Sequence, residues 1–363
     1  MDQKQTSAIT SFGTEIFKNC FDKTENVLIS PLSLTLALGM VMAGTDDETK
    51  EEMLNILSPG LSEKAFHEGL SDFVKNLPSS EDTNFTFADS LFVKEGVRIK
   101  KRFERKVEKR YNAEIRSLVF DENAVKEINS WVEEHTKGMI DRIMDDISPE
   151  AVLYLINALA FEGEWDKVYT TDNVIKGTFK DIDGNEKEAD FMWSDENIYI
   201  ENESCTGFVK PYKGQEYLFA AFLPREGKSV EELIKGLKSD DLTKMLKSAR
   251  AERCKTALPK FKADYSNLMN EVLYGCGLKR TLSPEADFSG ITRGYHGLGD
   301  ILHKTHIEVD EKGTRAGAVT SVMLKAMGMP VPMPEVILDR PFIYTIVDTR
   351  QAVPLFIGQV VTL

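Results

Sequence analysis

The segment EVDEKGTRAGAVTSVMLKAMGMPVPMPEV, residues 308–336, does not match any single regular element. When residues 314–325 are placed in an extended strand, successive side chains point to opposite faces. The two charged residues of this stretch, Arg315 and Lys325, fall on the odd-numbered face. The even-numbered face is uncharged throughout and small in its first half, so one face suits burial and the other suits solvent.

The end of the same segment argues against an ordinary central strand. Pro330, Pro332 and Pro334 follow directly, and proline lacks the N–H group that a central strand donates to its neighbour. Two interpretations remain open on the alternation alone. The segment is either a loop that can become a strand, or an edge strand followed by a turn.

The whole chain has the composition of a folded, acidic protein. It has 363 residues, 42% of them hydrophobic, which is enough to bury a sizeable core. The net charge of −14 disfavours unaided binding to nucleic acid or to an anionic membrane. No apolar run approaches the roughly 20 residues that span a bilayer. The first residues, MDQKQTSAIT, lack the signal-peptide pattern, so we expect a cytosolic protein or one from which a signal has been removed.

The cysteines are predicted to be free thiols. They have no CxxC spacing and no histidine close in sequence, which argues against a disulfide or a metal site. Cys20 continues an apolar helical stripe formed by Ile9, Phe12 and Ile16, as a buried thiol would. The four are Cys20, Cys205, Cys254 and Cys276.

Hydrophobic periodicity predicts one α+β unit that spans residues 1–363. The first half contains most of the expected helices, and the second half is mostly strands with one interrupting helix. There is no repeat, low-complexity tract or linker, so we expect helices packed on large, mainly antiparallel sheets. One expected helix follows a turn at Ser30-Pro31 and ends at Gly44. The other expected helices occupy 62–77, 101–111, 125–140 and 266–277. The expected strands lie within 84–96, 177–193 (with a turn at Asp183-Gly184), 216–229, 255–266, 300–310, 335–348 and 353–363, and 151–165 is a nearly continuous apolar run.

No motif predicts an enzyme. The chain has no GxSxG, no HExxH and no complete phosphate-binding loop, and its carboxylates are scattered. His303 shares one strand face with Ile301 and Ile307, so a hydrogen-bonded core histidine is favoured over a catalytic base. The basic run at 100–110 is interleaved with Glu104 and Glu108, which favours a solvated helix face with intrahelical ion pairs over a polyanion site. No cofactor or metal is expected.

Five blocks, taken together, resemble the serpin family in the family's own order. Each block is weak alone, but the five cover essentially the whole chain. The resemblance implies an α+β serpin fold with three β-sheets, eight or nine helices and an exposed reactive-centre loop, here at approximately 312–334. The blocks are NVLISPLSL, INALAFEGEW, FLPREGKS, HKTHIEVDEKGTRAGA and DRPFIYTIVDTRQAVPLFIGQVVTL.

The resemblance also implies an irreversible suicide-substrate inhibitor of serine proteases. In the family, the protease cuts the loop and forms an acyl-enzyme, and the freed loop inserts into the central sheet. Small, uncharged inward residues enter without overpacking, whereas a buried charge would cost several kcal/mol. The hinge of inhibitory members is matched here by Glu311, Gly313, Thr314, Ala316 and Ala318. Arg315 falls on the outward face and should be tolerated.

The reactive bond is predicted between Met327 and Gly328. Met327 is the seventeenth residue when Glu311 is counted as the first, which is the usual position in the family. Met327 indicates elastase-, chymotrypsin- or subtilisin-like targets. The loop is slightly longer than in the plasma members, which leaves Leu324, Lys325 and Met329 as alternative positions.

Further positions follow from the same motifs. Ser30, Ser33, Asn157 and His303 match the polar cluster beneath the central sheet where strands must part, called the shutter, and Trp165 matches the tryptophan at the breach where insertion begins. Core packing and hydrogen bonding also explain all five, and the two explanations do not exclude each other. The helix at 62–77, which carries glycosaminoglycan sites in some plasma members, has few basic residues, so no heparin activation is expected.

The expected partner is a target serine protease held as a covalent acyl complex by a monomeric inhibitor. We expect no nucleic acid or membrane partner and no enzymatic activity. An exported, extracellular place of action is favoured, with a cytoplasmic one possible. The alternatives are a non-inhibitory serpin that acts as a carrier or chaperone, and a hydrolase on an α/β scaffold.

Overall fold

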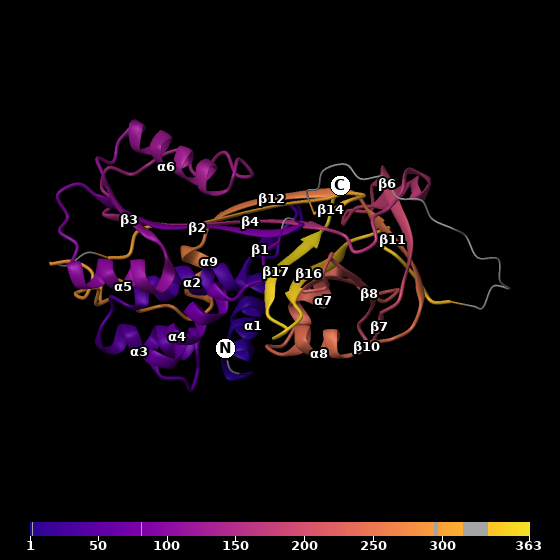
Figure 1. The fold of residues 1–363 in the computed structure, drawn as a ribbon, viewed down its shortest axis with the longest axis horizontal. Helices are drawn as coiled ribbons and strands as arrows, with labels where there is room; N and C mark the ends of the chain where they lie inside the picture. The colour runs from indigo at the N-terminus through magenta and orange to yellow at the C-terminus, as the bar shows by residue number, and fades with distance from the viewer. Residues whose placement is uncertain (2, 81, 294–296, 315–332) are drawn as a thin grey trace.

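The computed structural model describes residues 1, 3–80, 82–293, 297–314 and 333–363, and within them it has nine α-helices and three β-sheets. The six-stranded central sheet runs along the length of the molecule (Figure 1). Its β4 and β13 are parallel neighbours, paired from Ile301↔Leu155 to His306↔Ala160. In spatial order its strands are β12 (Phe261–Leu268), β13 (Ile301–Val309), β14 (Gly313–Thr314), β4 (Leu153–Glu164), β2 (Thr83–Lys94) and β3 (Glu114–Leu118).

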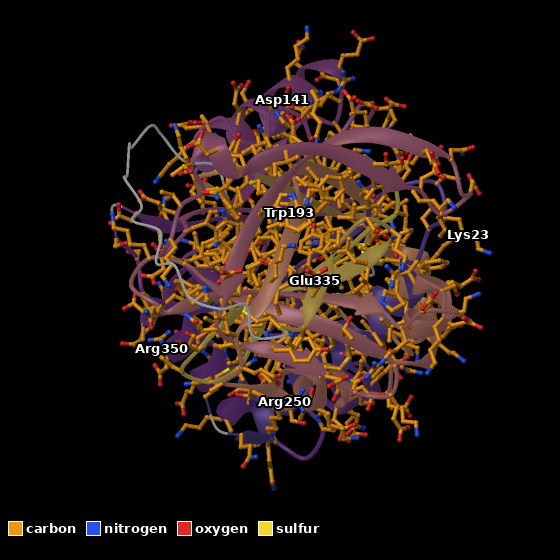
Figure 2. The ribbon with its side chains drawn as sticks, turned by 90° about the vertical axis from the view of Figure 1, so that its right-hand side faces the viewer. Lys23, Asp141, Trp193, Arg250, Glu335 and Arg350 are labelled. Atoms are coloured by element: carbon orange, nitrogen blue, oxygen red, sulfur yellow. The ribbon has the colours of Figure 1, made fainter. Side chains whose placement is uncertain are left out.

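The other two sheets lie at one end of the molecule. The second sheet contains β1 (Leu28–Ile29), β17 (Pro354–Val360), β16 (Phe342–Asp348), β9 (Tyr217–Pro224), β8 (Cys205–Pro211), β7 (Tyr199–Glu201) and β10 (Ala249–Arg250). The third sheet contains β15 (Glu335–Ile337), β11 (Cys254–Pro259), β6 (Glu186–Glu196) and β5 (Val174–Lys180). Figure 2 shows this end, with Trp193 of β6 and Glu335 of β15 labelled. Most pairings are antiparallel, as the sequence predicts; β2–β3, β4–β13 and β11–β15 are parallel.

Helices cover both faces of the central sheet (Figure 1). α6 (Glu122–His135) lies alone on one face, over a small apolar cluster that includes Phe92, Trp131 and Ile156. On the other face lie α1 (Gln3–Asn19), α2 (Pro31–Met42), α3 (Asp47–Leu57), α4 (Glu63–Lys75), α5 (Lys101–Tyr111) and α9 (Asn270–Gly275). Beside the second sheet lie α7 (Val230–Gly236) and α8 (Asp241–Lys247), and Thr171–Asn173 form a 3₁₀ turn.

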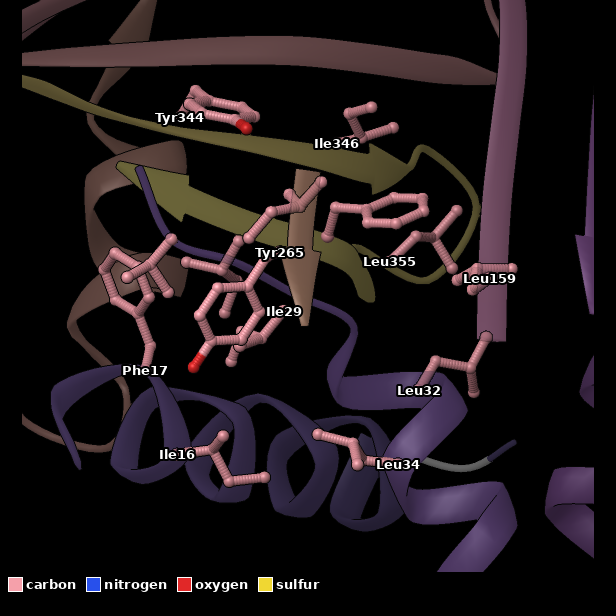
Figure 3. Packing of buried hydrophobic residues seen from close by; sticks show 14 of the residues in the cluster. Ile16, Phe17, Ile29, Leu32, Leu34, Leu159, Tyr265, Tyr344, Ile346 and Leu355 are labelled. Carbon is pink, nitrogen blue, oxygen red and sulfur yellow. The ribbon is translucent and has the colours of Figure 1, made fainter. Parts of the chain in front are cut away.

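The large core lies between the central sheet, the second sheet and α1 with α2. Figure 3 shows Ile16 and Phe17 of α1 and Leu32 of α2 facing Tyr265 of β12 and Leu159 of β4. Every residue of α2 is buried, because the helix lies between the central sheet and the neighbouring helices (Figure 1). The Ser30 side chain accepts a hydrogen bond from Ser33 N, and a proline follows it at the first helical position, so the turn predicted there is a helix N-cap. The four cysteines are free thiols, three of them buried.

Three boundaries differ from the sequence-based expectation. The expected helix 266–277 begins only at Asn270, because Ser266, Asn267 and Leu268 pair with β13 as the end of β12. The expected helix 125–140 ends at His135, and Gly138 has a φ of 76° in the turn that follows. The segment 335–348 is two strands in different sheets.

The sequence analysis also missed three helices, α3, α7 and α8. α7 has a capping box in which the Ser229 side chain accepts from Glu232 N and the Glu232 side chain accepts from Ser229 N, and this pattern could have revealed it. Among the described residues, no helix combines the length and the apolarity that crossing a bilayer requires.

Candidate functional site

The first residues of the predicted loop already form a strand inside the central sheet. Gly313 and Thr314 make up β14, which pairs antiparallel with β4 through Gly313↔Glu164 and Thr314↔Gly163. Thr314 also pairs with Val309 of β13 on the other side. β14 therefore lies between β13 and β4, above the stretch where those two strands pair directly. A Cβ atom at Gly313 would lie 1.9 Å from the Gly163 carbonyl oxygen, so only glycine fits.

Thr314 is fully buried, which agrees with its predicted inward face. Its Oγ1 lies 2.7 Å from the hydroxyl oxygen of Tyr212, itself buried at the bridge between Trp165 and Tyr212. Trp165 Nε1 donates to the Asp310 carbonyl at 3.0 Å, and the Trp165 backbone N donates to the Lys312 carbonyl at 2.8 Å. Trp165 thus holds both the turn before the hinge and, through its stacked neighbour Tyr212, the hinge itself.

Glu311 stands at the outer edge of this turn. Its carboxylate pairs with Lys260 at 2.8 Å, and both side chains are about one-third exposed. Partial burial acts to raise the pKa of Glu311, but the hydrogen bond and charge of Lys260 outweigh it and hold the pKa below its usual value. The hinge is therefore anchored from Lys260, the residue between β11 and β12, as well as from β4.

A buried ion pair lies beside the tryptophan and was not predicted. Lys210 Nζ lies 2.7 Å from Glu196 Oε1, with 1% and 6% of their side chains exposed. The same ammonium lies over the rings of Tyr169, at 4.2 Å, and Trp165, at 5.5 Å. Burial opposes the charge on Lys210, but Tyr169 and Glu196 outweigh it and raise its pKa. The sequence feature that could have predicted a buried lysine is the position of Lys210 inside the apolar run GFVKPY.

The structure brings together the four residues predicted at the shutter. Asn157 Oδ1 lies 2.6 Å from His303 Nδ1, and Asn157 Nδ2 donates to Ser33 Oγ at 2.5 Å. His303 Nε2 accepts from Ser30 N at 3.2 Å. All four side chains are fully buried on the α2 face of the central sheet. Burial lowers the pKa of His303 to about 3, which agrees with the expected core histidine. We call these residues, together with Asp89, the gate cluster.

Asp89 is the member of the gate cluster that the sequence analysis missed. It lies on β2 directly opposite Asn157, whose Nδ2 also donates to Asp89 Oδ1. Burial raises the pKa of Asp89 to about 7. Its signal was a charged residue on the otherwise apolar strand face of Phe85, Phe87 and Leu91.

Comparison with known proteins agrees with this geometry. The model of the serpin (serine protease inhibitor) family matches residues 7–363. The chain belongs to the serpin family.

Relatives across this family share the fold over its full length. The native-state crystal structure of the thermophilic serpin tengpin is 42% identical, superposes with a TM-score of 0.96, and is matched over 100% of this chain and 95% of its own. An uncharacterised serpin-like protein of Thermococcus kodakarensis is 32% identical over 97% of this chain and 84% of its own length. A loop C-sheet serpin polymer, at 42% identity, has a TM-score of 0.87 and is matched over 100% of this chain and 96% of its own.

Several residues that the serpin resemblance assigned lie outside the described residues. They are the hinge residues Ala316 and Ala318, the predicted reactive bond Met327–Gly328, and the alternatives Leu324, Lys325 and Met329. The chain is described again from residue 333, where the Pro334 carbonyl accepts from Lys255 N and β15 joins the third sheet beside β11. Lys255 also pairs with Glu335 at 3.1 Å, so the far end of the loop is anchored there (Figure 2).

The basic helix of this serpin differs from the expectation. Among ion pairs between described residues, none joins Glu104 or Glu108 to a cation of α5, so the predicted intrahelical pairs do not form. The cations instead line a groove of about 550 Å³ between α5 and α4. Of the α4 residues that line this groove, Lys75 is the one lysine or arginine, and the absence of heparin activation stays a prediction. The α5 cations that line it are Arg102, Arg105, Lys106, Lys109 and Arg110.

Proposed function

We propose that this serpin is an irreversible suicide-substrate inhibitor of serine proteases of the elastase, chymotrypsin or subtilisin type. The observation that carries the proposal is β14. The hinge has a strand-forming start between β13 and β4, with Thr314 buried and uncharged. From residue 316 the even-numbered side chains up to Leu324 are also uncharged, so the rest of the loop can follow the same path.

The inhibitory chemistry begins as ordinary peptide hydrolysis. The protease serine Oγ attacks the Met327 carbonyl carbon, the C–N bond to Gly328 breaks, and the Gly328 nitrogen leaves with a proton from the protease histidine. The loop then remains joined to the protease as an ester. If it inserts as a strand faster than water cleaves that ester, the attached protease is carried along the sheet and trapped.

A gel titration with elastase, chymotrypsin and subtilisin, combined with mass spectrometry of the released C-terminal peptide, tests this function. A complex that resists denaturant and a peptide beginning at Gly328 are the expected results. A complex with a different peptide keeps the mechanism and moves the bond to Leu324, Lys325 or Met329. Clean cleavage without a complex, also by a trypsin-like protease, would instead favour a non-inhibitory carrier or chaperone.

An extracellular place of action belongs to the same proposal, since the target types are proteases that commonly act outside cells. Localisation of the protein in culture medium against cell extract by immunoblot tests it, and protein found only in the extract would contradict it. We further propose that the inhibitor acts as a monomer. Size-exclusion chromatography with light scattering should give a mass near 40.9 kDa.

A further inference from the structure

Asp89, Asn157 and His303 form a row across three strands of the central sheet. Asp89 lies opposite Asn157 in the β2–β4 register, and Asn157 lies opposite His303 in the β4–β13 register. The position of β14 shows that any strand continuing from it must pass between Asn157 and His303. Insertion therefore breaks the bond from His303 to Asn157 but leaves Asp89 and Asn157 on adjacent strands.

Hydrogen bonding fixes His303 in its neutral form in the closed row. Its Nε2 accepts from Ser30 N at 3.2 Å, so this nitrogen carries the lone pair. Nδ1 then carries the proton and donates to Asn157 Oδ1 at 2.6 Å. A second proton on Nε2 would point at the Ser30 N–H, so the closed row excludes the imidazolium.

Burial favours the protonated form of Asp89 in the closed row, although the hydrogen bond from Asn157 acts in the opposite direction. The carboxyl is partly exposed, yet it forms no ion pair with any Lys, Arg or His of the described residues. It accepts from Asn157 Nδ2, whose other hydrogen goes to Ser33 Oγ, so Asn157 has no further donor to give. A partly buried carboxyl without a cation beside it keeps its proton to a higher pH than it would in water.

Other ionisable groups around the row do not offset these two. α2 has none between Pro31 and Met42, and Glu162 and Glu164 of β4 lie at its far end, on the face opposite Asn157. On the β12 side, Tyr265 and Cys20 are buried, and burial raises the pKa of each. Behind α2, His67 bonds to Tyr111. The charged residues of β13 lie on the opposite face: Lys304 donates to the Arg142 carbonyl, His306 pairs with Asp264, and Glu308 pairs with Lys262. Glu114 of β3 accepts from Trp131.

We propose that Asp89 is a positioning residue of the gate that acts through Asn157 and compensates His303, so that opening of the central sheet depends little on pH. This inference rests on the proposed function, in which β4 and β13 separate. When they part, water reaches both side chains. His303 then gains a proton and Asp89 loses one, so opening neither takes up nor releases a net proton.

Taken singly, His303 and Asp89 have opposite effects on how the ease of opening changes with pH. The closed row binds fewer protons than the open one at His303, so His303 alone would make opening easier as pH falls below about 6.5. The closed row binds more protons at Asp89, so Asp89 alone would make opening easier as pH rises from about 4 to about 7. The slopes cancel where the two ranges overlap.

Annealing of a synthetic peptide with the sequence of residues 314–327 measures opening without a protease. Its rate of incorporation, followed by native gel, is recorded from pH 5 to pH 8 for four proteins. The wild type should vary by less than about fivefold. Asp89→Asn should anneal at least about tenfold faster at pH 5 than at pH 7.5, and His303→Gln at least about tenfold slower, because each loses one of two opposite slopes. Asp300→Asn, which changes an acid outside the row, should match the wild type.

The inference would be overturned if the annealing rate of Asp89→Asn did not change with pH. It would also be overturned if the wild type annealed faster at pH 5 than at pH 7.5 by as much as this variant is expected to. If a variant fails to fold, the Asp89 carboxyl of the wild type can be followed by ¹³C NMR, and titration near pH 4 overturns it equally. Peptide annealing with the expected profiles in a protein that traps no protease would contradict the proposed function and leave this inference standing.

Discussion

The hydroxyl groups of Thr314 and Tyr212 lie 2.7 Å apart, and neither is exposed to solvent. This bond joins the second residue of β14 to a residue in the connection between β8 and β9. Because β14 has only two residues, a single buried hydrogen bond is a large part of what keeps it in the sheet.

Tyr212→Phe should therefore loosen the hinge. Loss of one buried hydrogen bond costs about 1 kcal/mol, which corresponds to roughly fivefold faster amide exchange at Thr314. Hydrogen exchange with mass spectrometry of a peptide covering 309–316 measures this. Tyr217→Phe is the control, because that buried hydroxyl donates to the Pro78 carbonyl, away from the hinge. Equal exchange in the wild type and Tyr212→Phe would show that backbone pairing alone holds β14.

If the proposed function holds, a charge at position 314 should make this serpin a substrate of its target protease rather than a trap for it. Thr314 has no exposed surface, so Thr314→Arg would bury an unpaired guanidinium at a cost of several kcal/mol and slow insertion. Since about 1.4 kcal/mol changes a partition tenfold, at least about ten loops should be cleaved for each protease trapped. Arg315→Glu is the matched control, because strand alternation in the sequence predicts an outward side chain at 315, and it should trap protease as the wild type does. Trapping by Thr314→Arg at the wild-type ratio would rule out insertion of this residue.

The Lys210–Glu196 pair should be far more valuable to stability than the surface pairs. Glu196→Gln leaves the Lys210 ammonium buried without its counter-ion, and loss of one partner of such a pair costs about 3–5 kcal/mol. The midpoint of urea unfolding should fall accordingly, and the double variant Lys210→Met with Glu196→Gln should recover much of the loss. Lys176→Met, at an exposed pair with Glu188, should have little effect. A double variant worse than both singles would mean that the packing of Lys210 on Tyr169 and Trp165 outweighs the charge pairing.

His67 should make the native state less stable in acid. Burial and the positive charge of Arg110 lower the pKa of His67 to about 4, below the usual value near 6.5, so the unfolded chain binds this proton first. Stability from this residue is full above about pH 6.5 and is lost as pH falls toward 4, with about 2 kcal/mol gone at pH 5. Urea unfolding of the wild type and His67→Gln at pH 7.5 and pH 5 measures the difference. The variant should lose less on acidification, and an equal loss in both proteins would contradict the assignment.

The sequence predicts the framework of this fold because long strands and helices have strong periodicity. Alternation in β13 places His303 on the buried face, and the small even-numbered face starting at Thr314 predicts the inward side chain that the structure has. α7 and α8, with seven residues each, are too short for periodicity to reveal them. The sequence analysis places Ser266, Asn267 and Leu268 in a helix, but pairing with β13 makes them the end of a strand.

The polar partners of the site could not be predicted in the same way. Asp89 and Asn157 are 68 residues apart, and they meet only because the register of β2 on β4 places them opposite each other. The roles of Ser30, Ser33 and Trp165 came from family motifs rather than from any local pattern. Their hydrogen bonds became visible once α2 and the strands were in place.

The parallel pairing of β4 with β13 gives loop insertion a direction. β14 follows β13 through a tight turn and therefore runs opposite to it, and opposite to β4 as well. A longer β14 would replace one ladder of slanted, slightly weaker parallel bonds with two antiparallel ladders. Under the proposed function, part of the free energy that would drive insertion therefore resides in the parallel pairing of β4 and β13, which a longer β14 would replace.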